Sequence, residues 1–144
     1  MSDVNLSKTV DTYCKNIRNE VERTRKKTGV NNGIRDYPAV AVVAADRGLT
    51  FSGKGRSCKV QYREYDDTPK LKNKLQSLGV IGKKRRECEN IIGACAEPHA
   101  AHRVIRHFGQ SMNLSQLVFS VAYRPRTMEK IEYCDNCKLT FPTI

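Results

Sequence analysis

The chain has 144 residues, of which 39% are hydrophobic and 28% charged, and its formal net charge is +11. This size and apolar content predict one domain, residues 1–144, with a core of its own. Because no apolar run approaches the roughly 18 residues that a membrane crossing needs, a transmembrane helix is excluded, and no secretory signal pattern opens the chain. A cytoplasmic, nucleoid or nuclear site of action is therefore expected.

The first half of the sequence predicts a helix followed by two paired strands. Apolar residues at spacings of three and four indicate an N-terminal helix within residues 1–28, with an apolar stripe of Leu6, Val10, Tyr13, Cys14, Ile17 and Val21. The continuous apolar run Pro38–Ala45 is typical of a strand covered on both faces. After a turn at residues 46–48, Leu49–Ser52 is expected to pair back on it as a hairpin strand.

Residues 54–93 are interpreted as a variable basic insertion. The alternation of Val60, Tyr62 and Glu64 indicates a strand, and Pro69–Leu78 indicates a short basic helix. Cations gather in this region at Lys70, Lys72 and Lys74, and again at Lys83, Lys84, Arg85 and Arg86. The second cluster comes shortly before a cysteine motif at Cys95.

The second half of the sequence predicts helix, strand and helical turn. Cys95 opens a helix that Gly109 ends, with a buried face of Ala100, Ala101, Val104, Ile105 and Phe108. The segment 114–123 reads as one strand, residues 124–126 as a turn, and a strand or loop then leads to Cys134, where a last helical turn begins. The order of elements favours an α/β fold.

Three cysteines have the spacing of a metal site. Cys134 and Cys137 form a C-x-x-C pair, and Cys95 comes from another helix. Three thiolates leave the fourth tetrahedral position of Zn²⁺ free for water, which is the arrangement of a catalytic zinc site. Glu97 is close enough in sequence to Cys95 to move protons to and from that water. The remaining thiols, Cys14, Cys58 and Cys88, are interpreted as ordinary and buried, in a reducing compartment.

Two other interpretations of these residues stay open. His99 lies four residues after Cys95 and could complete a closed, structural zinc site with the three cysteines. Alternatively, the cysteines form a zinc knuckle that stabilises a nucleic-acid-binding module without catalysis. His99, His102 and His107 are otherwise expected to face solvent or to form hydrogen bonds.

The motif residues resemble a known family. The string Ala94–Ala101 contains Cys95-Ala96-Glu97, which resembles the [HC]-A-E motif of the zinc-dependent cytidine deaminase-like superfamily, and Cys134/Cys137 resemble its P-C-x-x-C motif. The likeness is greatest to deaminase domains of bacterial polymorphic toxins and effectors, and it extends from about Pro38 to the C-terminus. The sequence departs from the pattern at Tyr133, where the family has proline, and it stops seven residues after Cys137, where many members continue with further strands.

The resemblance implies a fold and a chemistry. The fold would be a three-layer α/β/α sandwich with a mixed central sheet, truncated after the last motif helix. Zn²⁺ would be held by Cys95, Cys134 and Cys137, and Glu97 would be the catalytic acid and base in converting cytosine to uracil. Weaker candidates for substrate binding are the backbone N–H near Ala96 and the side chains of Ser52, Lys54 and Arg56.

The net charge bears on the substrate and partners. A strongly basic surface favours a polyanion, either DNA or RNA or an acidic inhibitor such as an immunity protein of a toxin. The clusters Lys83, Lys84, Arg85 and Arg86, with the aromatic residues Tyr62, Tyr65 and Tyr123, suit a nucleic acid with an exposed base. A deaminase of free nucleosides or nucleotides is the alternative enzyme, since such a substrate needs no basic surface.

Overall fold

The computed structural model describes residues 4–144, which fold as a mixed α/β domain. No helix among them is long and apolar enough to cross a membrane. The elements in chain order are α1 (Leu6–Thr28), β1 (Ala41–Asp46), β2 (Ser52–Arg56), α2 (Pro69–Gln76), β3 (Lys84–Arg85), β4 (Cys88–Ile91), α3 (Ala96–Phe108), β5 (Leu117–Phe119), β6 (Ala122–Arg124), β7 (Glu129–Ile131) and α4 (Asp135–Thr140). Short 3-10 turns at Gly33–Asp36 and Leu114–Gln116 complete them.

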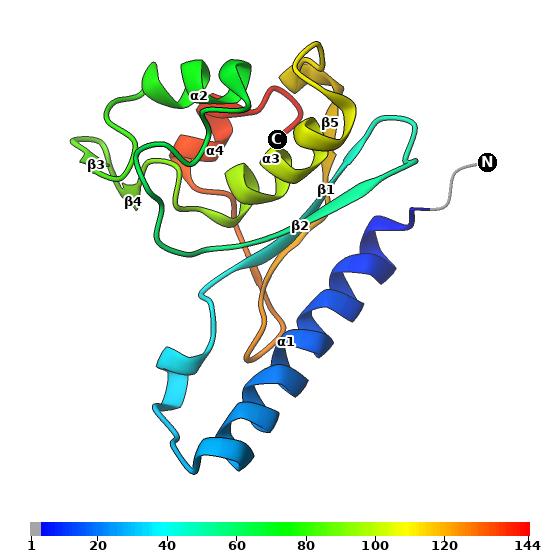
Figure 1. Cartoon of the computed structure of the whole chain (residues 1–144), viewed down its shortest axis with the longest axis vertical. Coiled ribbons are helices and arrows are strands. Elements are labelled where there is room, and N and C mark those ends of the chain that lie inside the picture. The colour runs from blue at the N-terminus through cyan, green and yellow to red at the C-terminus, as the bar shows by residue number, and fades with distance from the viewer. Residues whose placement is uncertain (1–3) are drawn as a thin grey trace.

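The central sheet has five strands in the order β2-β1-β6-β7, with β5 also paired to β1 (Figure 1). Every strand pairing within residues 4–144 is antiparallel, so the prediction of a mixed sheet is wrong for this part of the chain. The reason is the connectivity. β1 and β2 form a hairpin, as do β6 and β7, and α3 returns the chain beside β1 in the opposite direction.

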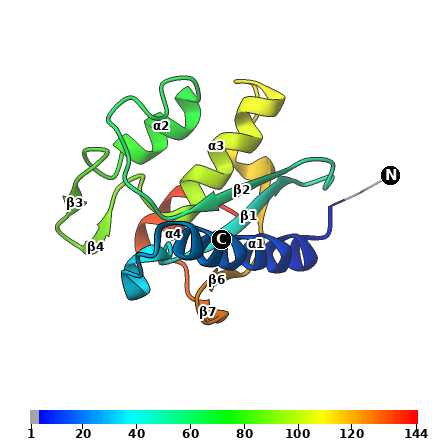
Figure 2. The ribbon, with the colours of Figure 1, turned by 60° about the horizontal axis from the view of Figure 1, so that its bottom comes forward.

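β1 is the centre of the core, and helices cover it from two sides (Figure 2). Val42 and Ala44 pack into a cluster with α3, whereas Ala41 and Val43 pack into a second cluster with α1. Both sets of side chains are fully buried, which confirms the predicted strand covered on both faces. The predicted N-terminal helix is also confirmed, and its buried stripe is Val10, Cys14, Ile17 and Val21.

The partner strand of the hairpin begins later than predicted. Residues 49–51 form the end of a turn in which the Asp46 carboxylate accepts hydrogen bonds from the backbone N–H groups of Thr50 and Phe51, both at 2.9 Å. β2 is instead the segment Ser52–Arg56, of sequence Ser-Gly-Lys-Gly-Arg. It has no apolar alternation because α3 lies directly against its backbone. A Cβ at Gly55 would be 2.2 Å from the Ala96 carbonyl oxygen.

The segment predicted as a variable basic insertion therefore starts after β2, near residue 57, rather than at residue 54. The strand expected around Val60, Tyr62 and Glu64 is absent, and consecutive turns occupy that segment. The alternation is misleading because the buried aromatic residue is Tyr65, whose hydroxyl donates to the Gly93 carbonyl at 2.5 Å, while Tyr62 is 60% exposed. The predicted helix at residues 69–78 is confirmed as α2, with Leu71 and Leu75 buried.

The second half follows the predicted order with two differences. α3 buries Ala100, Ala101, Val104 and Ile105 as expected, but Phe108 is 42% exposed and meets Phe51 edge-on. The strand predicted over residues 114–123 is divided into β5 and β6. At the division, the backbone N–H of Ser120 donates to the Val43 carbonyl and its hydroxyl accepts from the Val43 N–H. The Ser120 side chain thus takes one position in the ladder that a backbone carbonyl would occupy.

Candidate metal centre

The three predicted cysteines meet at the N-terminal ends of two helices. Cys95 is the residue that precedes α3, and Cys134 precedes α4, which carries Cys137 in its first turn. Their sulfur atoms all lie within 4.8 Å of one another, with 3.3 Å between Cys95 and Cys134 and 3.6 Å between Cys134 and Cys137. Sulfur atoms on a tetrahedral zinc with Zn–S bonds of about 2.3 Å are about 3.8 Å apart. The three sulfur donors fit a metal ion that prefers soft thiolate ligands.

The close approach of the three sulfurs shifts the pKa values of the thiols. Hydrogen bonds from the neighbouring thiols lower the pKa of Cys134, while the same hydrogen bonds raise the pKa of Cys95 and Cys137. The thiolate of Cys134 is thus stabilised, while Cys95 and Cys137 are favoured as protonated thiols that donate to it. Three adjacent thiolates require a bound cation to balance their charge, and metal binding at such a site releases protons.

Glu97 is held beside the sulfurs and is almost fully buried. The side chain is on the first turn of α3, only 3% of the residue is exposed, and the Cys137 thiol contacts its Oε1 atom at 3.4 Å. Burial raises the pKa of the Glu97 carboxyl, and the hydrogen bond from Cys137 opposes this effect. A buried carboxyl with a raised pKa beside a candidate metal site is suited to taking up and returning protons.

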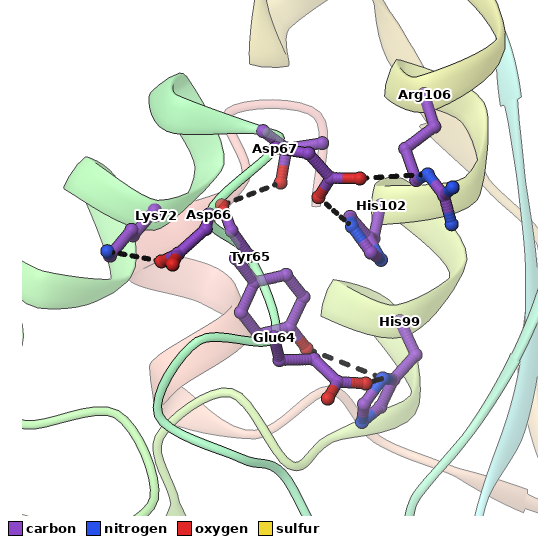
Figure 3. A network of polar contacts seen from close by, with 9 residues as sticks. Glu64, Tyr65, Asp66, Asp67, Lys72, His99, His102 and Arg106 are labelled. Atoms are coloured by element: carbon purple, nitrogen blue, oxygen red, sulfur yellow. Dashed lines mark hydrogen bonds and ion pairs between the residues drawn. The ribbon is translucent and has the colours of Figure 1, made fainter.

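His99 belongs to a different set of contacts (Figure 3). Its Nε2 atom lies 3.3 Å from Cys58 Sγ, and its Nδ1 atom lies 3.5 Å from the Tyr65 hydroxyl and 3.9 Å from a Glu64 carboxylate oxygen. Both ring nitrogens therefore face the segment 58–65, and the described group of potential metal ligands contains the three cysteines without His99. This geometry argues against the closed four-ligand site.

The rest of that network attaches the loop before α2 to α3. Asp67 accepts a hydrogen bond from His102 at 2.8 Å and pairs with Arg106 at 2.9 Å (Figure 3). His102 lowers the pKa of the Asp67 carboxyl. His107 does not join these contacts, because it stacks on Phe51 with ring centroids 3.7 Å apart. The expectation of hydrogen-bonded histidines is confirmed for His99 and His102.

A cavity of about 520 Å³ opens over the sulfurs. Its wall includes Cys95, Ala96, Glu97 and Cys134 on one side and the segment 57–59 on another. The β3–β4 hairpin adds Lys84, Glu89, Asn90 and Ile91. A cavity of this size is large enough for a nucleobase with its sugar, as ligand pockets are about 300–1,000 Å³.

The hairpin is fixed to the metal centre through Asn136. This residue lies between Cys134 and Cys137, is 3% exposed, accepts a hydrogen bond from Arg85 Nε and donates to the Asn90 carbonyl at 3.1 Å. The sequence pattern missed this role, because an asparagine within C-x-x-C has no spacing signal of its own. Arg85, predicted as a substrate contact, is instead occupied by Asn136 and by Glu87.

Replacing Asn136 by alanine should therefore destabilise the protein. The change removes the acceptor of Arg85 Nε and the donor to the Asn90 carbonyl, and such losses cost about 1–3 kcal/mol for a buried group. Thermal unfolding of the zinc-loaded protein measures the effect, with Lys138→Ala on the exposed side of α4 as the control. Equal melting temperatures for the two variants would contradict the assigned role of Asn136.

The other predicted substrate residues are divided between two places. Ala96 and Lys84 line the cavity over the sulfurs, whereas Ser52 and Lys54 line a separate hollow of about 430 Å³ near the end of α3. Arg56 points toward α1, where it pairs weakly with Glu20 at 4.0 Å. Lys83 and Arg86 are exposed residues of the β3–β4 region.

The aromatic and cysteine predictions need correction. Tyr65 is fully buried, so it is excluded as a stacking residue for a base, and Tyr123 packs against the cluster around α1. All three remaining thiols were expected to be buried, and this holds for Cys14. Cys88 is half-buried, and Cys58 is exposed and lines the cavity over the sulfurs. No local pattern marks the contact between Cys58 and His99, since 41 residues separate them.

Tyr133, the departure from the family pattern, has a structural role. Its hydroxyl donates to the carbonyl of Ser120, at the division between β5 and β6, and so ties the approach to Cys134 to the sheet. Burial and the neighbouring Glu97 raise the pKa of Tyr133 to about 12, so its hydroxyl stays protonated and can donate.

Comparison of the chain with protein-family models, with curated proteins and with solved structures found no significant match.

Proposed function

We propose that this protein is a zinc-dependent hydrolytic deaminase that converts cytosine to uracil in DNA or RNA. The observation that carries the proposal is the group of three sulfurs with a buried carboxylate, Glu97, beside a cavity of about 520 Å³ that Cys95, Glu97 and Cys134 line. The resemblance of the two motifs agrees with it, and the proposed fold is the three-layer sandwich of that superfamily. A toxin-type deaminase with an acidic inhibitor protein is part of the same proposal.

The residues divide the chemistry in the following way. Zinc held by the three thiolates would lower the pKa of a bound water molecule to about 7. Glu97 accepts the proton of that water and delivers it to the ring nitrogen next to the amino-bearing carbon. The water oxygen would add to that carbon as a hydroxyl group. Glu97 would then take the proton of this hydroxyl and pass it to the amino group, so that the carbon–oxygen double bond forms as ammonia leaves. The backbone N–H near Ala96, in the cavity wall, is the proposed donor to the base.

The position of Glu97 favours an enzyme over a structural zinc module. Burying a carboxyl group that forms no ion pair destabilises a fold, so a module that only binds would be more stable with an apolar residue there. Glu97 is 3% exposed, and its hydrogen-bond partner is the Cys137 thiol rather than a cation. His99 turned away from the sulfurs supports the same choice, because the fourth metal position stays available to water.

Direct assay of purified, zinc-loaded protein tests the proposal. The substrates are single-stranded DNA, duplex DNA, RNA and free cytidine, and uracil formation is read by sequencing and by mass spectrometry. We expect uracil in at least one nucleic acid at a rate that chelation of zinc abolishes. Conversion of cytidine alone would identify the free-nucleoside enzyme, and no conversion of any substrate by protein with stoichiometric zinc would refute deamination.

The cations of the hairpin give a second prediction. Lys83, Lys84 and Arg86 are exposed, and Lys84 lines the cavity, whereas Arg85 has a structural partner. Changing these three to glutamine should reduce the slope of log affinity against log salt for single-stranded DNA by about 2 units, at about 0.7 for each lost phosphate contact. Activity on free cytidine should not change, because cytidine carries no phosphate. An unchanged slope would show that these cations make no phosphate contacts and only face solvent.

A further inference from the structure

The open edge of the central sheet carries positive charge away from the metal centre. β2 is the last strand on its side of the sheet, and Gly53 and Gly55 face α3, so Lys54 and Arg56 take the alternate positions. The two glycines allow α3 to lie on β2 in backbone contact. A Cβ at Gly53 would lie 2.6 Å from the Ala100 carbonyl oxygen and 2.9 Å from Arg103 Cβ. Arg103 is therefore brought to the same edge.

The direction of this edge connects it to the cavity. Gly55 contacts Ala96, next to Cys95, while Gly53 contacts the following turns of α3. The chain leaves β2 at Arg56 and enters the cavity wall at residues 57–59. The edge therefore begins at the cavity and extends along β2 for about 13 Å, at about 3.3 Å for each residue.

Lys54, Arg56 and Arg103, which we call the β2-edge strip, are poorly neutralised. Neither Lys54 nor Arg103 forms an ion pair with a carboxylate among the described residues. Arg56 reaches Glu20 only at 4.0 Å, and both side chains are about half exposed. Burial raises the pKa of the Cys58 thiol, Glu64 raises it further, and Arg56 and Arg103 oppose both effects. The two guanidinium groups thus act on a residue of the cavity wall.

At the far end of the strip lies the hollow of about 430 Å³. It is lined by Lys54 and Arg103 together with Phe51, Ser52, Gly53, Arg106 and His107. Cationic and aromatic side chains in one groove are the combination by which proteins hold single-stranded nucleic acid without reading its sequence. One strand of B-form DNA has a phosphate for about every 3.4 Å of helix axis, and an extended single strand spaces its phosphates further apart, so a path of about 13 Å can meet about two or three of them.

We propose that the β2-edge strip binds the sugar-phosphate backbone of a single-stranded nucleic acid whose target base occupies the cavity over the sulfurs. The strip leads the strand from the cavity along β2 to the hollow at Phe51 and His107. The alternative is that Lys54 and Arg56 only protect an edge strand from pairing with another chain. That role needs no cation on α3, and it does not account for Arg103.

The test measures binding rather than turnover. In zinc-loaded Glu97→Gln protein, the triple change Lys54→Gln/Arg56→Gln/Arg103→Gln should reduce the salt slope for a 12-nucleotide single-stranded DNA or RNA by about 2 units. A trinucleotide should show a smaller reduction, because it ends before the hollow. The matched control is Lys8→Gln/Arg23→Gln/Lys15→Gln, which removes the same charge from exposed positions of α1 and should leave the slope nearly unchanged.

The inference rests on the proposed nucleic-acid substrate, but its failure is distinguishable from failure of that proposal. Fluorescence anisotropy at several salt concentrations gives the slope whether or not the protein deaminates, and the DNA and RNA arms separate the two polymers. An unchanged slope in the strip variant, an equal reduction in the α1 control, or an equal reduction for the trinucleotide would each overturn the strip. So would an unchanged slope with new dimers in light scattering, which would assign the cations to edge protection.

Discussion

Glu97→Gln should reduce cytosine deamination by about 10²–10⁴-fold while the protein keeps its zinc and its melting temperature within a few degrees. The size of the effect is that of a lost general acid and base, since glutamine has nearly the same shape but cannot exchange the proton. The variant is measured by uracil formation under single-turnover conditions, with zinc content determined on the same sample. The contact between Glu97 and Cys137 makes both measurements necessary.

The control for this variant is Glu22→Gln, an exposed carboxylate of α1 that should leave turnover unchanged. Deamination by Glu97→Gln within tenfold of the wild type would exclude the proton-transfer role. Loss of zinc from Glu97→Gln would instead assign Glu97 to the metal site itself, as a ligand or as a support for Cys137.

Removing two sulfurs should have the larger effect on the fold. Cys134→Ser/Cys137→Ser is expected to lose its zinc and to unfold at a much lower temperature, because structural zinc contributes an apparent binding free energy of about 10–16 kcal/mol in small zinc peptides. Elemental analysis and thermal unfolding measure the two consequences. Cys58→Ser/Cys88→Ser removes the same number of thiols outside the sulfur group and should keep a full equivalent of zinc. Zinc retained in the first variant would refute the ligand assignment.

The parts of the fold that the sequence predicted well are those with a strong apolar pattern. The stripe of α1 and the buried face of α3 follow the helical repeat, and β1 is a short, continuous apolar run with β-branched residues, as a strand buried on both faces requires. The prediction placed the strand β2 too early in the chain. Its inward positions are Gly53 and Gly55, where α3 lies too close for a side chain, so these positions carry no hydrophobic signal. The β3–β4 hairpin, with exposed residues at most positions, was missed for the same kind of reason.

The candidate site shows a similar division. Cys95, Cys134 and Cys137 could be grouped from sequence because few other chemistries need thiols at that spacing, and the structure brings them together. The contacts of Asn136, Cys58 and His99 depend on tertiary packing, and no local pattern marks them. Whether the substrate is a nucleic acid stays a prediction, because positive charge is a property of the surface as a whole.

The sulfur group also connects parts of the chain that are distant in sequence. Cys95 and Cys134 are 39 residues apart, and the chain between them forms all of α3, β5, β6 and β7. A metal ion joining these cysteines closes a long loop, whose entropy must be lost before the coordination bonds can form. The ion should therefore bind late in folding, after β5 and β6 have paired with β1, and its departure should release the C-terminal half of the sheet first.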